Sequence, residues 1–150
     1  MSGARPTAVL FVCGLNAVRS PMAEAIARRL YGRTVWFQSA GVRSGELDPF
    51  SVKVMEEVGL DISKHRPHTI EDLEDDNFDL VVTLAPEAHH KALEMTRTMA
   101  MDVEYWPTPD PQLATGSREQ ILDAYRQVRD GLEWRIKKRL DETLGSAGGG

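Results

Sequence analysis

The segment AVLFVCGLNAVRSPMAEAIARRL, residues 8–30, passes from a strand through a short loop into a helix, and this order decides the fold. Its first part, AVLFV (8–12), is a continuous apolar run, which is typical of a strand buried on both faces of a sheet. Ser20 and Pro21 are residue types preferred at a helix N-cap and at the first helical position, so we expect a helix to begin there. The intervening loop starts at Cys13, the single cysteine of the chain.

The rest of the chain repeats this alternation of strands and helices. Further strands are predicted at TVWFQS (34–39), FDLVVTL (78–84) and VEYW (103–106). Helices are expected from Asp48-Pro49 to Gly59, from Pro86 to about Met99, and after the capping residues Ser117 and Gln120. Strands separated by helices predict an α/β fold, namely a doubly wound four-stranded parallel sheet with helices on both faces. We expect one domain over residues 1–144 and a flexible Gly/Ser tail over residues 145–150.

Composition and charge argue against several classes of function. One cysteine cannot form an internal disulfide or supply a zinc site that uses two or more cysteines. A net charge of −5 argues against general nucleic-acid binding. No apolar run approaches the ~20 residues of a membrane span, and the N-terminal MSGARPTA lacks the apolar centre of a secretory signal. We therefore expect a cytoplasmic protein that binds neither nucleic acid nor membranes.

The loop after Cys13 has the composition of an anion-binding site. In a parallel sheet it would lie at the carboxyl ends of the strands, where ligands bind. The N–H groups of the loop and of the following helix N-terminus favour an anion, and Arg19 can donate two parallel hydrogen bonds to it. The same surroundings favour a thiolate at Cys13, with the Ser20 hydroxyl placed to donate to it. Asn16 is suited to the left-handed backbone geometry that such a loop needs. The alternative is an inert thiol in the core, as for most lone cysteines.

The segment FVCGLNAVRSPMAE (11–24) closely resembles the phosphate-binding loop of the low-molecular-weight protein tyrosine phosphatases and of the arsenate reductases that share their fold. The resemblance continues through the segments SAG (39–41), GLDISKHRPHTI (59–70), DLVVTL (79–84) and WPTPDPQLATGSREQ (106–120). It implies a phosphotyrosine phosphatase I-like fold and a cysteine-dependent phosphomonoester hydrolase that acts through a cysteinyl-phosphate. The implied substrate is a phosphorylated protein or a small phosphoester, and neither a cofactor nor a metal is required.

Carried over by position, the resemblance makes Cys13 the nucleophile, Arg19 the group that stabilises the transition state and Asp110 the general acid. Asn16 and Ser20 would support the loop. The phosphate-binding residues would be Gly14, Leu15, Asn16, Ala17, Val18 and Arg19.

Two Asp-Pro pairs compete for the role of general acid, which must protonate an otherwise poor leaving group. Asp48 precedes an expected helix, and an N-cap role explains it fully. Asp110 follows the last expected strand in a Pro-rich loop, so it would lie at the same sheet edge as Cys13. On sequence alone an ordinary Asp-Pro turn explains Asp110 as well, and the family resemblance favours the catalytic role for it.

The sequence departs from the phosphatases at the pocket walls. The order CGLN exchanges Gly14 and Leu15 relative to the usual pattern, so Leu15 would project at the pocket mouth. Residues 40–48 (AGVRSGELD) contain no aromatic side chain, and Gln112 follows Asp110-Pro111. The aromatic walls that would hold a phosphotyrosine ring are therefore missing.

An arsenate reductase is the alternative, because residues 106–130 look more like that group. TLAPEAHHKAL (83–93) holds no second thiol, so no intramolecular disulfide relay can form. A single-cysteine reaction coupled to a small thiol such as mycothiol or glutathione is compatible with the sequence. A non-catalytic phosphate or phosphoprotein sensor is a third class, which turnover would distinguish from the first two.

Overall fold

The computed structural model describes residues 5–74 and 77–147. The strands are β1 (Ala8–Cys13), β2 (Trp36–Gly41), β3 (Leu80–Thr83) and β4 (Asp102–Tyr105). The α-helices are α1 (Arg19–Tyr31), α2 (Pro49–Glu56), α3 (Pro86–Met95) and α4 (Arg118–Ala147), and the short 3-10 helices are η1 (Ile70–Asp72) and η2 (Pro111–Leu113). Within these ranges no helix has the length and apolar character needed to cross a membrane.

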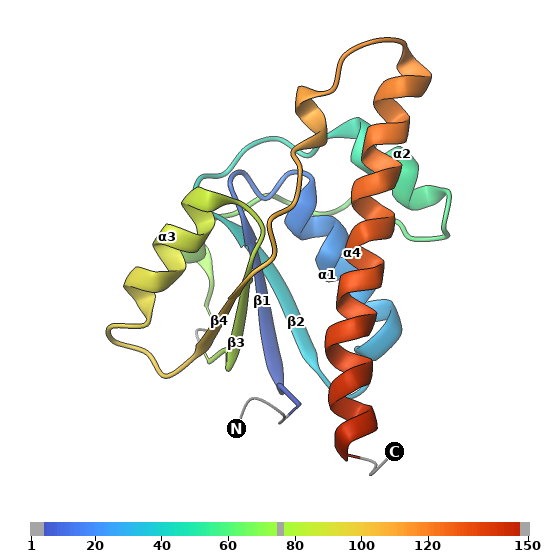
Figure 1. The fold of residues 1–150 in the computed structure, drawn as a ribbon. Helices are drawn as coiled ribbons and strands as arrows, with labels where there is room; N and C mark the ends of the chain where they lie inside the picture. The colour runs from blue at the N-terminus through green and yellow to red at the C-terminus, as the bar shows by residue number, and fades with distance from the viewer. Residues whose placement is uncertain (1–4, 75–76, 148–150) are drawn as a thin grey trace.

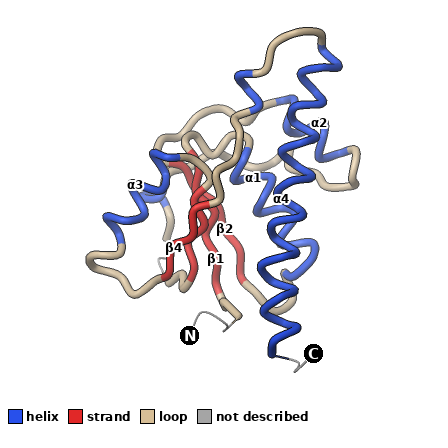
Figure 2. Tube along the Cα trace, viewed as in Figure 1, coloured by secondary structure: helices blue, strands red, loops and turns tan. Residues whose placement is uncertain are grey.

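The strands are all parallel and lie in the order β2-β1-β3-β4 (Figures 1 and 2). α1 and α4 cover one face of the sheet with α2 packed against α4, and α3 covers the other face (Figure 1). The predicted doubly wound sheet is therefore confirmed. From the central strand β1 the chain continues to β2 on one side, and β3 pairs with β1 on the other. The strand order thus reverses beside the carboxyl end of β1, where folds of this kind bind ligands.

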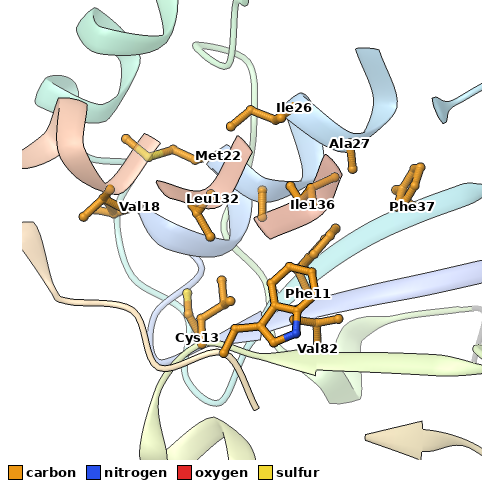
Figure 3. Close-up of a cluster of buried hydrophobic side chains, with 14 of the residues drawn as sticks. Phe11, Cys13, Val18, Met22, Ile26, Ala27, Phe37, Val82, Leu132 and Ile136 are labelled. Carbon is orange, nitrogen blue, oxygen red and sulfur yellow. The ribbon is translucent and has the colours of Figure 1, made fainter. Parts of the chain in front are cut away.

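β1 divides two apolar cores because successive side chains of a strand point to opposite faces. Val9, Phe11 and Cys13 belong to the larger cluster, which packs against α1 and α4 (Figure 3). Leu10 and Val12 belong to the smaller cluster against α3. Cys13 is only 2% exposed, and it shares the face of Phe11. Its thiol is therefore on the side of the sheet where α1 begins.

The start of α1 differs from the sequence-based prediction. The helix begins at Arg19, and its N-cap residue Val18 makes no side-chain capping bond. Ser20 therefore is not the cap. It lies in the first turn, fully buried, and its hydroxyl oxygen is 2.9 Å from the Cys13 sulfur.

Two helix ends also differ from expectation. α3 ends at Met95 instead of about Met99, and the Thr96 hydroxyl donates to the Leu93 carbonyl at 2.7 Å, a local bond of the kind that competes with helix continuation. α4 continues to Ala147 and includes the first residues expected in the flexible tail. A single Gly145 does not stop it, because glycine costs an established helix only about 1 kcal/mol. Residues 148–150 of that tail lie outside the described residues.

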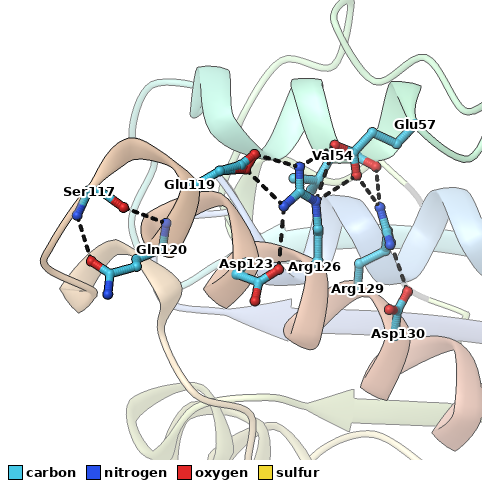
Figure 4. A network of polar contacts seen from close by, with 9 residues as sticks. All are labelled: Val54, Glu57, Ser117, Glu119, Gln120, Asp123, Arg126, Arg129 and Asp130. Atoms are coloured by element: carbon cyan, nitrogen blue, oxygen red, sulfur yellow. Dashed lines mark hydrogen bonds and ion pairs between the residues drawn. The ribbon is translucent and has the colours of Figure 1, made fainter.

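A polar network joins α2 to α4 on the surface (Figure 4). Arg126 donates to both carboxylate oxygens of Glu57, with Nη2 2.8 Å from Oε2 and Nε 3.0 Å from Oε1. Arg129 donates to Glu57 Oε1 at 2.9 Å and to the Val54 carbonyl at 2.7 Å. The predicted cap of α4 is also confirmed, because Ser117 and Gln120 bond reciprocally.

Replacing Glu57 by Gln is expected to lower stability in a pH-dependent way. The hydrogen bond from Arg126, assisted by Arg129, lowers the pKa of Glu57 from 4.5 to about 2. A depressed carboxyl pKa stabilises the fold above pH 4.5, and this contribution is lost as the pH falls toward 2. Because Glu57 is partly exposed, we expect a loss of about 2–4 °C in Tm at pH 7. Thermal melts at pH 7 and pH 3 should show a smaller difference at pH 3, and an equal difference at both would contradict this assignment.

Candidate active site

Loops after all four strands meet at one cavity of about 90 Å³ at the carboxyl edge of the sheet. The predicted residues Cys13, Arg19 and Asp110 all line it. Its full lining comprises Cys13, Gly14, Leu15, Ala17, Val18, Arg19, Arg43, Glu87, Asp110 and Gln112. Asp110 therefore meets Cys13 and Arg19 at a single small space although about 90 residues or more separate it from them, as expected for loops at the carboxyl ends of parallel strands. No group of three or more His, Cys, Asp or Glu residues in the described ranges is arranged to hold a metal ion.

The loop from Cys13 to Val18 (the anion loop) is curled by hydrogen bonds to the segment after β2. The carbonyls of Cys13, Gly14, Leu15 and Ala17 accept from backbone N–H groups within residues 42–48. In a trans peptide the N–H points opposite to the carbonyl, and no cis peptide occurs in the described residues. The N–H groups of residues 14–16 and 18 therefore point away from that segment, toward the inner side of the turn. Successive backbone N–H groups that point to one side in this way have the geometry of a nest, a shape that suits an anion.

Glycine at position 41 allows this close approach. A Cβ built on Gly41 would lie 2.9 Å from both the Asn16 backbone nitrogen and the Gly14 carbonyl oxygen. It would lie nearer still, at 2.5 Å, to the Arg43 carbonyl oxygen. Any larger residue would push the loop away from the end of β2. Gly41 thus fixes the curvature of the loop although it does not line the cavity.

Asn16 braces the loop from beneath and does not line the cavity. It has φ 56°, the one positive φ of a non-glycine residue among the described residues. Its amide nitrogen donates to the hydroxyls of Ser20 at 2.9 Å and Ser39 at 3.0 Å. Its amide oxygen lies 2.8 Å from His65 Nε2 and accepts from the His68 backbone N–H at 3.1 Å. Because the side chain is fully buried and every hydrogen-bonding capacity is used, Asn16 holds the loop in one conformation.

The Cys13 sulfur lies 2.9 Å from the Ser20 hydroxyl oxygen. Since the Asn16 amide already donates to this oxygen, the hydroxyl hydrogen is free to point at the sulfur. The competing acceptor, the Ala40 carbonyl, is farther from the hydroxyl, at 3.4 Å. In this orientation the Ser20 hydroxyl donates to the Cys13 sulfur, which lies beside the first turn of α1.

Arg19 and Asp110 approach the cavity from two different elements that are in contact. Arg19 is the first residue of α1, and its Nη1 donates to the Thr108 carbonyl at 3.0 Å. Thr108 and Asp110 belong to the same loop between β4 and η2. Asp110 caps η2 by accepting from the Gln112 N–H at 3.0 Å through Oδ1, and it also lines the cavity. The bond from Arg19 thus ties the start of α1 to the loop that carries Asp110.

The structure distinguishes the two Asp-Pro pairs. Asp48 is 8% exposed and caps α2, accepting from the Phe50 N–H at 2.7 Å, as predicted. Its other oxygen accepts from the Tyr125 hydroxyl at 2.7 Å and from Gln112 Nε2 at 3.0 Å. Burial and the hydrogen bond to Asp48 raise the pKa of Tyr125. Asp48 therefore joins α2, η2 and α4, and only Asp110 lines the cavity.

His65 is a site residue that the sequence analysis did not single out. Its ring is half-buried beneath the loop, and burial lowers its pKa, which favours the neutral imidazole. A neutral ring with its hydrogen on Nε2 donates to the Asn16 oxygen. The sequence did contain a signal for His65, because it lies in the segment 59–70 that resembles the phosphatases. The resemblance gave no role to the histidines of that segment. Arg43 and Glu87 at the cavity were also missed, because their loops showed no recognisable motif.

The sequence and the structure of this chain are both similar to those of known proteins. Residues 8–147 match the family described as low molecular weight phosphotyrosine protein phosphatase. The chain is 37% identical to the arsenate reductase of Bacillus subtilis (strain 168) over 130 residues, which cover 87% of this chain and 92% of that protein. A solved low molecular weight protein tyrosine phosphatase from T. tengcongensis superposes with a TM-score of 0.74 at 28% identity, covering 91% of this chain and 99% of the other. A solved arsenate reductase in the oxidised state gives a TM-score of 0.75 at 28% identity, covering 91% and 98%.

Proposed function

This chain belongs to the low molecular weight phosphotyrosine protein phosphatase family, and we propose that it is a cysteine-dependent phosphomonoester hydrolase. The observation that carries the proposal is the meeting of Cys13, Arg19 and Asp110 at one cavity. A nucleophile, a cation and an acid around one small anion-sized space are the groups that phosphoryl transfer requires. The substrate is a phosphorylated protein or a small phosphoester, and the enzyme acts in the cytoplasm.

In the first step the Cys13 thiolate attacks phosphorus in line with the leaving oxygen. The new S–P bond replaces the P–O bond, and Asp110 gives its proton to the departing alkoxide or phenoxide. Arg19 and the inward N–H groups of the loop carry the charge that develops on the equatorial oxygens. The product is a cysteinyl-phosphate and a free alcohol.

In the second step water attacks the cysteinyl-phosphate. Asp110, now a carboxylate, accepts a proton from this water, and the S–P bond breaks to release inorganic phosphate. Ser20 donates to the departing thiolate, and the bond that holds it in place comes from Asn16. Besides the substrate and one water molecule, both steps use side chains and backbone N–H groups of the cavity and its supporting network.

Reduction of arsenate is the second candidate, supported by the 37% identity to an arsenate reductase. Arsenate has the shape and charge of phosphate and fits the same cradle, where Cys13 would form an S–As bond with loss of water. A first external thiol would attack the Cys13 sulfur and form a mixed disulfide with it, while the S–As bond breaks and its electron pair leaves with arsenic as arsenite. A second external thiol would then attack the mixed disulfide, which releases Cys13 as a thiol and the two external thiols as one disulfide. The external thiols are needed because Cys13 is the single cysteine of the chain.

Parallel assays of the wild-type enzyme distinguish the two candidates. We expect hydrolysis of p-nitrophenyl phosphate at a rate that does not depend on the concentration of glutathione or mycothiol, provided that Cys13 is kept reduced. Arsenate added to the ester assay should inhibit hydrolysis competitively, and arsenate supplied with the thiol alone should give no arsenite. Negligible ester hydrolysis together with thiol-dependent arsenite formation would overturn the phosphatase proposal and establish the second candidate.

A further inference from the structure

A charged pair stands at the mouth of the cavity where aromatic walls are absent. Arg43 from the segment after β2 and Glu87 from the first turn of α3 form a bidentate ion pair. Their nitrogen–oxygen distances are 2.6 Å and 3.1 Å. Both residues line the cavity together with Cys13. The pair therefore joins the segment after β2 to the start of α3 at the cavity.

The pair lies directly on the anion loop. A Cβ built on Gly14 would be 2.5 Å from Glu87 Oε1 and 4.0 Å from Arg43 Nη2. Glycine at this position therefore leaves the space that the Glu87 carboxylate occupies. The side chain of the neighbouring Leu15 packs against Gly45. A Cβ built on Gly45 would lie 3.2 Å from the Leu15 side chain. The exchanged order of Gly14 and Leu15 thus agrees with the structure, because Glu87 needs a glycine at position 14 and Gly45 leaves room for the leucine at position 15.

The bond between Arg43 and Glu87 is one that an entering anion can replace. Their side chains are 59% and 42% exposed, and ion pairs with such exposure contribute only about 0–1 kcal/mol. A phosphate or arsenate dianion offers the guanidinium a charge-assisted hydrogen bond to an oxygen that carries more charge than a carboxylate oxygen. Arg43 therefore needs no large rearrangement of the backbone to exchange Glu87 for a ligand oxygen.

We propose that Arg43 is a specificity-determining residue that binds the oxygen of a tetrahedral oxyanion facing away from Cys13, with Glu87 as its counter-ion in the empty site. This inference rests on the proposed oxyanion chemistry of the cavity. In-line attack by Cys13 places one oxygen opposite the sulfur, toward the mouth. In free phosphate or arsenate this oxygen is charged and suits Arg43, whereas in an aryl ester it carries the ring. The favoured ligands are therefore small inorganic oxyanions, and aryl phosphates gain little from Arg43.

Calorimetric titration of inorganic phosphate and of arsenate into Arg43→Gln tests the proposal without turnover. Against a Cys13→Ser background, we expect the added Arg43→Gln to weaken binding at least about 10-fold, as for loss of charge-assisted hydrogen bonds. Arg43→Lys keeps the charge without the fork and should give a smaller loss. Glu87→Gln frees Arg43 and should tighten binding. Lys91→Gln is the matched control, since it removes a cation from α3, the helix that carries Glu87. Lys91 pairs with Glu71 at 3.0 Å and does not line the cavity.

Kinetics of Arg43→Gln in the wild-type background separate oxyanion binding from ester binding. We expect the inhibition constant of inorganic phosphate to rise about 10-fold while the KM for p-nitrophenyl phosphate changes by less than about 3-fold. Equal rises in both constants would make Arg43 a general attractor of anions and overturn the proposed selectivity. If Arg43→Gln left phosphate binding unchanged in the calorimetric titration, Arg43 and Glu87 would form a surface ion pair with no role in ligand binding. If the ester is not hydrolysed at all, the phosphatase proposal fails, and the calorimetric titrations still decide the role of Arg43.

Discussion

Cys13→Ser should reduce kcat for phosphoester hydrolysis by at least about 10⁴-fold while the protein stays folded. The serine hydroxyl fits the space of the thiol, so the loop and the 2.9 Å contact with Ser20 should persist. A hydroxyl is a far weaker nucleophile at neutral pH, because the environment that favours a thiolate cannot ionise an alcohol. The measurements are kcat with p-nitrophenyl phosphate and the Tm of both proteins.

Binding of inorganic phosphate gives the control for this substitution. The cradle of inward N–H groups and Arg19 do not depend on the sulfur, so Cys13→Ser should still bind phosphate. The sequence left an inert buried thiol as the alternative, and burial of Cys13 to 2% exposure does not by itself refute it. A variant that keeps more than a few per cent of the wild-type kcat would support that alternative.

The sheet was predictable from sequence because its signals are local. Each buried strand is a short apolar run, and Asp48-Pro49 and the Ser117–Gln120 pair mark helix starts that depend on neighbouring backbone groups. Ser20 shows the limit of this approach. A serine before a proline satisfies the local rule for an N-cap, but Ser20 lies inside the first turn of α1, where its hydroxyl makes the predicted contact with Cys13.

The supporting residues of the site were less predictable because their partners are distant in sequence. His65 bonds Asn16 across 49 positions, and Arg43 bonds Glu87 across 44. Nothing within a window of either residue indicates these contacts. The anion loop could be recognised because one segment contains the nucleophile, the cation and the helix N-terminus together. Residues that act through tertiary contacts needed the folded chain.

Asp110→Asn should lower kcat by about 10² to 10³-fold, and by more when the leaving group is less acidic. Asparagine can still cap η2 through its side-chain oxygen, as Asp110 does toward the Gln112 N–H, so the loop should keep its shape. What is lost is the proton for the departing oxygen. The loss should therefore be larger for phenyl phosphate than for p-nitrophenyl phosphate, since p-nitrophenolate leaves readily without protonation.

Asp48→Asn is the matched control, because it alters the other Asp-Pro pair, which holds elements together. Its carboxylate accepts from the Tyr125 hydroxyl and from Gln112 Nε2 through one oxygen. We expect this variant to lose several degrees in Tm, with a smaller loss of kcat that is the same for both esters. If instead Asp110→Asn affected the two esters equally and Asp48→Asn distinguished between them, the general acid would be Asp48. The dependence on the leaving group, unlike the size of the rate loss, separates proton donation from support of the loop.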